Sequence, residues 1–174
     1  MRGHALERLA AWDRLLCRRF NRASHFAAVR LLLVTVSRLG NGIFWYCLMA
    51  ALLTFGPPGA VSVVARMFGA GVVCTVLYKW IKRSTSRPRP YAAQPEIMLH
   101  AAPLDQFSFP SGHTLHATAL SLIVVSYYPS LVWLLAPFAA LVALSRVVLG
   151  LHYPSDVLAG ALLGAMIAGV FVSI

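Results

Sequence analysis

The chain has 174 residues, of which 59% are hydrophobic and only 11% are charged, and its mean hydropathy is +0.74. Because average soluble proteins carry about 25% charged residues, this composition excludes an ordinary soluble domain and indicates an all-α integral membrane protein. Lys and Arg outnumber Asp and Glu by 15 to 5, which gives a net charge of +10. The cations flank apolar runs, a pattern typical of lipid headgroup contact rather than of nucleic-acid binding. We expect one membrane-embedded domain over residues 1–174.

The first predicted element covers residues 1–22. Apolar residues such as Leu6, Leu9 and Leu16 alternate with arginines at roughly helical spacing. The arginines are Arg2, Arg8, Arg14, Arg18, Arg19 and Arg22. This pattern is typical of a basic amphipathic helix that lies in the headgroup plane, and a frayed basic tail is the alternative.

The segment Ser24–Leu39 is ambiguous as a membrane span. It is apolar at its centre, but it carries Arg30 and Arg38 and is short for a crossing of the bilayer. Gly40-Asn41-Gly42 follows and is expected to break the helix. If Ser24–Leu39 crosses, the chain forms a six-helix transmembrane bundle, which is the arrangement that we expect. If it does not cross, the alternative is five spans plus interfacial helices.

The rest of the chain alternates apolar helices with short turns and one long polar stretch. Helices are predicted at Ile43–Phe55 and Ala60–Tyr78, with a tight turn at 56–59 between them. Residues 79–110 are polar, and a loop of this length in a compact protein is usually functional. Further helices are predicted at 112–127, 130–149 and 155–173. In the last of these, Gly160 and Gly164 form a small-xxx-small pair that favours close helix packing.

Three polar segments far apart in the sequence are predicted to share one face of the bilayer. They are Lys82–Pro90, Pro110–His113 and Arg146–Asp156. Lys82, Arg89 and Arg146 supply three cations, which suit the oxygens of a phosphate group and the extra charge of its transition state.

The second and third segments add the groups that phosphoryl chemistry needs. Ser111 and Gly112 stand at a turn into a helix, where free backbone N–H groups bind anions and glycine permits a close approach. Asp156 follows His152 by four residues, which suits it to orient the imidazole for nucleophilic attack. His113 is placed as a second imidazole that protonates the leaving group. No cluster of Asp, Glu or Cys near these cations indicates a metal site.

Taken together, these residues resemble a known three-part signature. Lys82 is followed after six residues by Arg89-Pro90, then Pro-Ser-Gly-His at 110–113, then Ser-Arg at 145–146, His152 and Asp156. The pattern is similar to that of the type 2 phosphatidic acid phosphatase superfamily of membrane lipid phosphatases, and no signature position departs from it.

The resemblance implies a metal-independent and cofactor-independent phosphatase that acts through a phosphohistidine on a lipid monophosphate or diphosphate. His152 would be the nucleophile, Asp156 its partner and His113 the acid. The phosphate ligands would be Lys82, Arg89, Ser111, Gly112 and Arg146. The bacterial relatives that the chain resembles also imply the inner membrane, with the active site on the outer, periplasmic face.

Two other functions are open at this point, and several residues receive secondary interpretations. A vanadate-dependent haloperoxidase would use the same pocket, but those relatives are soluble. A non-catalytic lipid-binding protein would be expected to break the signature. Arg87 is interpreted as a headgroup contact, His116 as a hydrogen-bonded helix residue, and Asp105 as part of a solvated loop.

Overall fold

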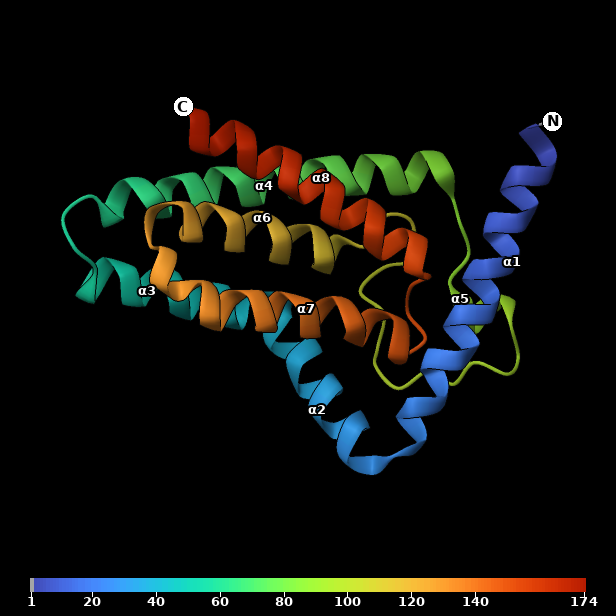
Figure 1. Ribbon diagram of the computed structural model, residues 1–174. Coiled ribbons are helices and arrows are strands. Elements are labelled where there is room, and N and C mark those ends of the chain that lie inside the picture. Colours follow the sequence, from blue (N-terminus) through green and yellow to red (C-terminus); the bar gives the residue numbers. More distant parts are fainter. Residues whose placement is uncertain (1) are drawn as a thin grey trace.

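Five helices run side by side through the long dimension of the molecule, and the polar loops gather at one end of them (Figure 1). The structure is a computed structural model that describes residues 2–174, with side chains from residue 7 onward. Its bundle helices are α3 (Phe44–Phe55), α4 (Ala60–Thr85), α6 (Gly112–Tyr127), α7 (Val132–Val148) and α8 (Pro154–Ser173). The described residues contain no strand, so the prediction of an all-α membrane protein is confirmed.

Helix α6 is the central element of the bundle, packed against α4, α7 and α8. Eight of its side chains are buried although it has only 16 residues. The predicted small-residue pair of α8 lies against it: a Cβ added to Gly160 would stand 2.6 Å from the carbonyl oxygen of Ser111, and one added to Gly164 would stand 2.4 Å from that of Leu115. The glycines therefore let α8 approach the backbone of α6 directly.

The segment between residues 27 and 55 forms one bent helix. Helix α2 (Ala27–Arg38) continues through a π-helical turn, η2 (Leu39–Ile43), into α3. The bend is located at Gly42, whose φ of 129° is open to glycine and strained for other residues. Ala27–Phe55 is accordingly a single candidate membrane span, so Ser24–Leu39 does not cross on its own. By length and composition the described residues hold four candidate spans, and the 16-residue α6 is not one of them, so the number of crossings stays a prediction.

Helix α4 is longer than predicted and shortens the polar loop. Residues 79–85 continue the helix to Thr85, where Ser86 ends it in a left-handed conformation. The short helix α5 (Pro90–Ala93) follows, and irregular backbone then leads to the start of α6. Lys82 is therefore held on the last turn of a long, packed helix and does not lie in a mobile loop.

Helix α1 (Arg2–Asn21) crosses the loop end of the bundle, and a 3₁₀ turn, η1 (Arg22–His25), connects it to α2 (Figure 1). The Asn21 side chain donates to the carbonyl oxygens of Met98 and Val148, each at 2.9 Å. Trp12 and Phe20 of the same helix are exposed. This combination of one docked face and exposed aromatic and basic residues is consistent with the predicted headgroup location.

Candidate active site

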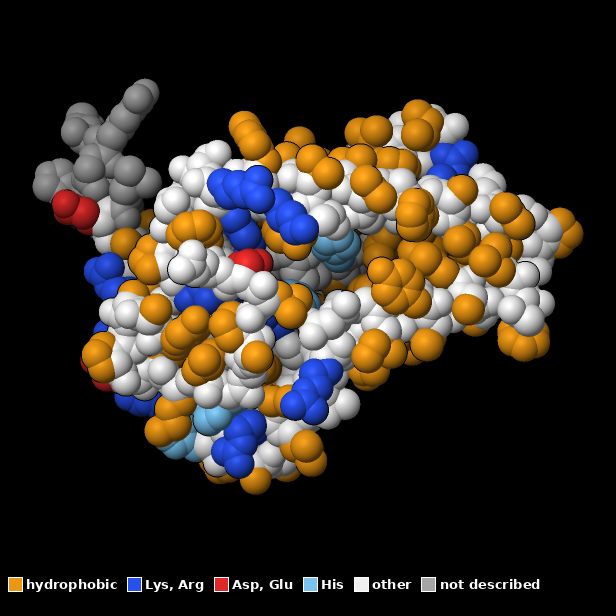
Figure 2. Space-filling model, turned by 180° about the vertical axis from the view of Figure 1, so that it is seen from behind, with side chains coloured by type: hydrophobic (Ala, Val, Ile, Leu, Met, Phe, Trp, Pro, Cys, Tyr) orange, Lys and Arg blue, Asp and Glu red, His pale blue; other side chains and the backbone are white. Residues whose placement is uncertain are grey.

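A cavity of about 420 Å³ opens at the loop end of the bundle. Six of the eight predicted site residues line it: Lys82, Arg89, Gly112, His113, Arg146 and His152. Ser111 and Asp156 lie directly behind this wall, joined by a backbone hydrogen bond of 3.0 Å from Ser111 N to Asp156 O. Figure 2 shows basic side chains gathered around this end of the molecule and hydrophobic side chains over the rest of that face.

His152 is held on the tight turn between α7 and α8. The backbone N–H groups of Leu151 and His152 both donate to the carbonyl oxygen of Arg146 at 3.0 Å, and Gly150 has a φ of 76°, which favours glycine. The imidazole is 1% exposed. Its Nε2 lies 3.2 Å from Arg89 Nη1, on the cavity side.

Two features keep His152 neutral and oriented. Burial, and then the charges of Arg89 and Arg146, lower its pKa well below the ordinary value. Its Nδ1 faces Asp156 Oδ2 at 3.6 Å, which is longer than a normal hydrogen bond but close enough for strong charge stabilisation once the ring becomes cationic. Nε2 is the unprotonated nitrogen that accepts from Arg89, and it is suited to nucleophilic attack when a phosphate takes over that arginine.

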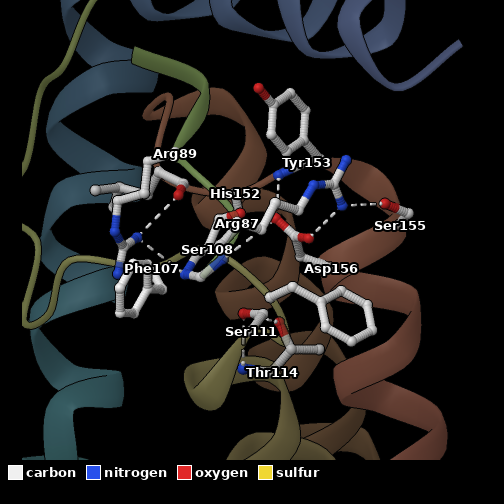
Figure 3. Close-up of polar contacts among 12 residues, drawn as sticks. Arg87, Arg89, Phe107, Ser108, Ser111, Thr114, His152, Tyr153, Ser155 and Asp156 are labelled. Carbon is white, nitrogen blue, oxygen red and sulfur yellow. Dashed lines mark hydrogen bonds and ion pairs between the residues drawn. The ribbon is translucent and has the colours of Figure 1, made fainter. Parts of the chain in front are cut away.

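Asp156 is fully buried in the first turn of α8. Its Oδ2 accepts the backbone N–H of Tyr153 at 2.8 Å, which caps the helix and fixes the carboxylate. Its Oδ1 accepts from Arg87 Nη1 at 2.6 Å (Figure 3). The expectation that Arg87 only contacts headgroups is therefore wrong: its guanidinium reaches the carboxylate behind the candidate nucleophile.

Two buried cations meet on one carboxylate at the cavity wall. Lys82 Nζ and Arg89 Nη2 each lie 2.7 Å from Asp105 Oδ1. Burial would raise the pKa of Asp105, but the hydrogen bonds and charges of Lys82 and Arg89 outweigh it and hold that pKa below its usual value. The expectation that Asp105 lies in a solvated loop is also wrong, because its carboxylate binds two cations that a phosphate would use.

Arg146 supplies a third buried cation in the lining of the cavity. It is 2% exposed, and its Nη1 donates to the hydroxyl of Ser37 on α2. Its Nε is buried with no hydrogen-bond partner among the described residues. Because an unpaired buried donor is costly and an anion would satisfy it, this guanidinium is suited to an oxyanion ligand.

The start of α6 forms the floor of the cavity. Ser111 is the N-cap residue, and its hydroxyl lies 2.9 Å from that of Thr114. A Cβ added to Gly112 would stand 3.3 Å from the ring of Tyr78, so this backbone is closely enclosed. The next residue, His113, directs its Nε2 to the side-chain oxygen of Asn41 in the π-helical turn. His116 is hydrogen-bonded as predicted, with Nδ1 2.8 Å from the carbonyl oxygen of Gly112.

Sequence reasoning missed five residues that complete the site: Asp13, Ser37, Asn41, Arg87 and Asp105. None belongs to the signature, and each reaches the site through tertiary packing. The available signal was the low number of acidic residues in a basic membrane chain, because a buried acid there is costly unless it is paired. Within the described part of the chain, no three His, Cys, Asp or Glu side chains are grouped to hold a metal ion.

The chain is similar to a protein-family model, to named proteins and to a solved structure. Residues 59–174 match the model of the PAP2 superfamily. An undecaprenyl-diphosphatase of Sulfolobus acidocaldarius is 31% identical over 87% of this chain and 73% of its own length. Phosphatidylglycerophosphatase B of Bacillus subtilis is 30% identical over 83% of this chain and 68% of its own. The crystal structure of Aquifex aeolicus LpxE has a TM-score of 0.80 and 27% identity, covering 91% of this chain and 93% of that one.

Proposed function

This chain belongs to the PAP2 superfamily and is a membrane lipid phosphatase, and we propose that it hydrolyses a lipid monophosphate or diphosphate through a phosphohistidine on His152, without a metal ion. One observation carries this proposal. The buried, neutral imidazole stands between Arg89 on the cavity side and Asp156 behind it, in a cavity that also holds Lys82 and Arg146.

The substrate phosphate replaces the carboxylate of Asp105 as the partner of two cations. Its oxygens take over Lys82 and Arg89 from the carboxylate of Asp105 and satisfy the unpaired Nε of Arg146. The N-terminal turn of α6 at Gly112 adds free backbone N–H groups. Charge developing on the transferred phosphoryl group is then met by donors already in place.

The chemistry proceeds in two displacements. His152 Nε2 attacks phosphorus, the bond from phosphorus to the leaving oxygen breaks, and His113 gives that oxygen its proton. Asp156 stabilises the cationic phosphohistidine through Nδ1. Water then attacks phosphorus with His113 accepting its proton, the phosphorus–nitrogen bond breaks, and inorganic phosphate leaves with neutral His152 restored.

The apolar part of the same cavity indicates where the lipid tail lies. Beyond the cations, its lining comes from α3, α4 and α6 and includes Trp45, Met49, Met67, Phe68 and Val72. Phe68 and Val72 of α4 are exposed, so a tail can lie along this apolar surface while the headgroup reaches His152. We propose an isoprenyl diphosphate or a glycerophospholipid phosphate as substrate, in agreement with the named activities of the relatives.

The orientation in the membrane rests on the family resemblance, which implies a bacterial inner membrane with the catalytic end on the outer face. The cation count alone favours the opposite orientation, because the arginines of α1 lie at the catalytic end. Arginines in a headgroup plane can, however, serve anionic lipids of either leaflet. We propose the outer face.

The test is phosphate release by the purified full chain in detergent, with excess chelator, from farnesyl diphosphate, phosphatidylglycerophosphate and phosphatidate. We expect turnover of at least one lipid that chelator does not change and vanadate inhibits. Turnover that chelator abolishes and Mg²⁺ restores would contradict the metal-independent mechanism. Absence of turnover on all three lipids, by a protein that remains folded, would contradict the proposed substrate class.

A further inference from the structure

Behind the candidate nucleophile, Arg87 lies between two buried carboxylates. Its Nη1 donates to Asp156 Oδ1 at 2.6 Å, and its Nη2 donates to Asp13 Oδ2 at 2.8 Å. Figure 3 shows the guanidinium extended between Tyr153 and Asp156, and its central carbon lies 4.2 Å from the centre of the Tyr153 ring. The planar fork of an arginine suits a bridge of this kind, because each arm contacts a different acid.

Asp13 brings the N-terminal helix into this group. The side chain is 3% exposed although α1 lies on the outside of the bundle. Its Oδ1 accepts the backbone N–H of Ser155 at 3.0 Å, and its Oδ2 also accepts from the Ser155 hydroxyl. Asp13 therefore joins α1 to the first turn of α8, beside Asp156, although it lies outside residues 59–174 that match the family model.

The charges of this group form a chain that ends at His152. When one arginine pairs with a single buried carboxylate, the two charges nearly cancel, and the carboxylate exerts little negative field on its other neighbours. With Asp13 also bound, the positive charge of Arg87 is divided between two acids, and Asp156 keeps field for the imidazole 3.6 Å away.

We propose that Asp13 and Arg87 are positioning residues of the reaction, which fix the orientation and the charge of Asp156 and so support the phosphohistidine. This inference rests on the proposed function. It makes α1 part of the active site and not only a membrane anchor.

Other titratable and charged groups surround His152 and Asp156, and their charges also act on the protonation of these two residues. On the cavity side they are Lys82, Arg89, Asp105, His113 and Arg146; behind are Cys17 and Tyr153. Burial, and then the charges of Asp156 and Asp13, raise the pKa of Cys17 to about 12, so this thiol stays neutral. Burial also raises the pKa of Tyr153 above its ordinary value. Neither group therefore titrates in the range where His152 does.

The first variant is Asp13→Asn, which keeps the shape of the side chain and removes its charge. Arg87 then neutralises Asp156 alone, so the field at His152 becomes more positive. We expect kcat to fall at least about tenfold, which is ~1.4 kcal/mol in the barrier, with KM changed less than about twofold because no phosphate contact is lost. The acid limb of the pH profile should move to lower pH, and Asp13→Glu should restore part of kcat.

Glu96→Gln is the matched control. Glu96 is an exposed acid after α5 that pairs at 4.0 Å with Arg18 of α1, the helix that carries Asp13. The variant removes the same charge and one contact of α1, and we expect unchanged kcat and an unchanged acid limb. If Asp13→Asn loses activity with the limb unmoved, its role is structural only and the inference is overturned.

A double-mutant cycle tests whether Asp13 acts through Arg87. If it does, Asp13→Asn adds little to the loss caused by Arg87→Gln, and the double variant stays within about twofold of Arg87→Gln. Losses that multiply would contradict the inference.

If Asp13→Asn does not accumulate in folded form, Arg87→Lys is the test. This variant keeps the positive charge but not the two-armed guanidinium, and we expect kcat to fall with KM retained. If the wild type turns over through a phosphohistidine and Arg87→Lys is fully active, this inference is overturned while the proposed function stands.

Discussion

At the scale of single residues, the site depends on burial that fixes the protonation of His152. A histidine at the surface would be partly protonated near neutral pH, since its ordinary pKa is about 6.5. Here the 1% exposed ring lies among the cations Arg89, Arg146 and Lys82, which all favour the neutral form. The cations that we propose as phosphate ligands therefore add to burial in keeping the proposed nucleophile unprotonated.

This arrangement predicts the pH dependence of the reaction. Because the pKa of His152 is lowered, the imidazole stays neutral as pH falls through about 6.5, and the acid limb of kcat/KM should lie below that pH. The unfolded chain binds a proton at His152 in this range while the folded chain does not, so stability should also fall as pH decreases. Activity profiles and thermal melts in detergent measure both; an acid limb above pH 6.5 would contradict this account.

At the scale of elements, the irregular segment between α5 and α6 supplies a carboxylate that pairs with two of the three cations. Asp105 comes from this segment and binds Lys82 and Arg89 through one carboxylate oxygen. Its side chain is 34% exposed, so it can leave without unpacking the core. We propose that this segment keeps the two cations paired with a carboxylate when no anion is bound.

Removal of the Asp105 charge should therefore tighten anion binding. In Asp105→Asn, phosphate and vanadate no longer compete with a carboxylate for Lys82 and Arg89. We expect the inhibition constant of vanadate to fall about tenfold, or ~1.4 kcal/mol, while Glu96→Gln leaves it unchanged. Measurement of inhibition constants for the three proteins tests this; weaker inhibition of Asp105→Asn would mean that Asp105 orients the cations and does not compete for them.

The elements also show how far the sequence could predict this structure. Hydropathy predicted α6, α7 and α8 closely, and the order of helices and turns predicted that the three polar segments share one end of the bundle. The predicted break at Gly40-Asn41-Gly42 is confirmed as a kink at Gly42, but its π-helical form was not predictable from a typical helix breaker. Only packing against α6 and α7 shows that the chain continues there as a π-helical turn and delivers Asn41 to His113.

The same limit applies to the acids of the site. Asp13 and Arg87 are 74 positions apart in the sequence and meet only because α1 folds across the loop end. No local pattern pairs them. The sequence pattern of a basic helix with one aspartate predicts a helix in the headgroup plane. Only the folded structure shows that the carboxylate of Asp13 is buried.

At the scale of the whole molecule, the described residues hold four candidate membrane spans, and we propose that the central helix α6 crosses with them, which gives five crossings. The single bent span Ala27–Phe55 replaces the two crossings that were expected, and α6 runs beside the other spans. Helix α1 lies at the catalytic end, and α8 ends at the opposite one (Figure 1).

This topology predicts termini on opposite faces of the membrane. With the catalytic end outside, as proposed, a fluorescent fusion after Ile174 should report the cytoplasm, and an N-terminal enzyme reporter that works only outside should be active. Termini on one face would contradict the five-span arrangement. Termini on opposite faces with the C-terminus outside would retain five spans and place the active site in the cytoplasm.

The most direct test of the central claim is to trap the covalent intermediate. Purified protein is mixed with phosphate-labelled farnesyl diphosphate, quenched in alkali within a turnover, and digested for mass spectrometry. The account predicts base-stable, acid-labile phosphate on His152, no intermediate and no turnover in His152→Ala, and a loss of turnover of about 10⁴-fold in Asp156→Asn, as when an orienting carboxylate is removed from a catalytic histidine. Label on another residue, or substantial turnover by folded His152→Ala, would contradict it.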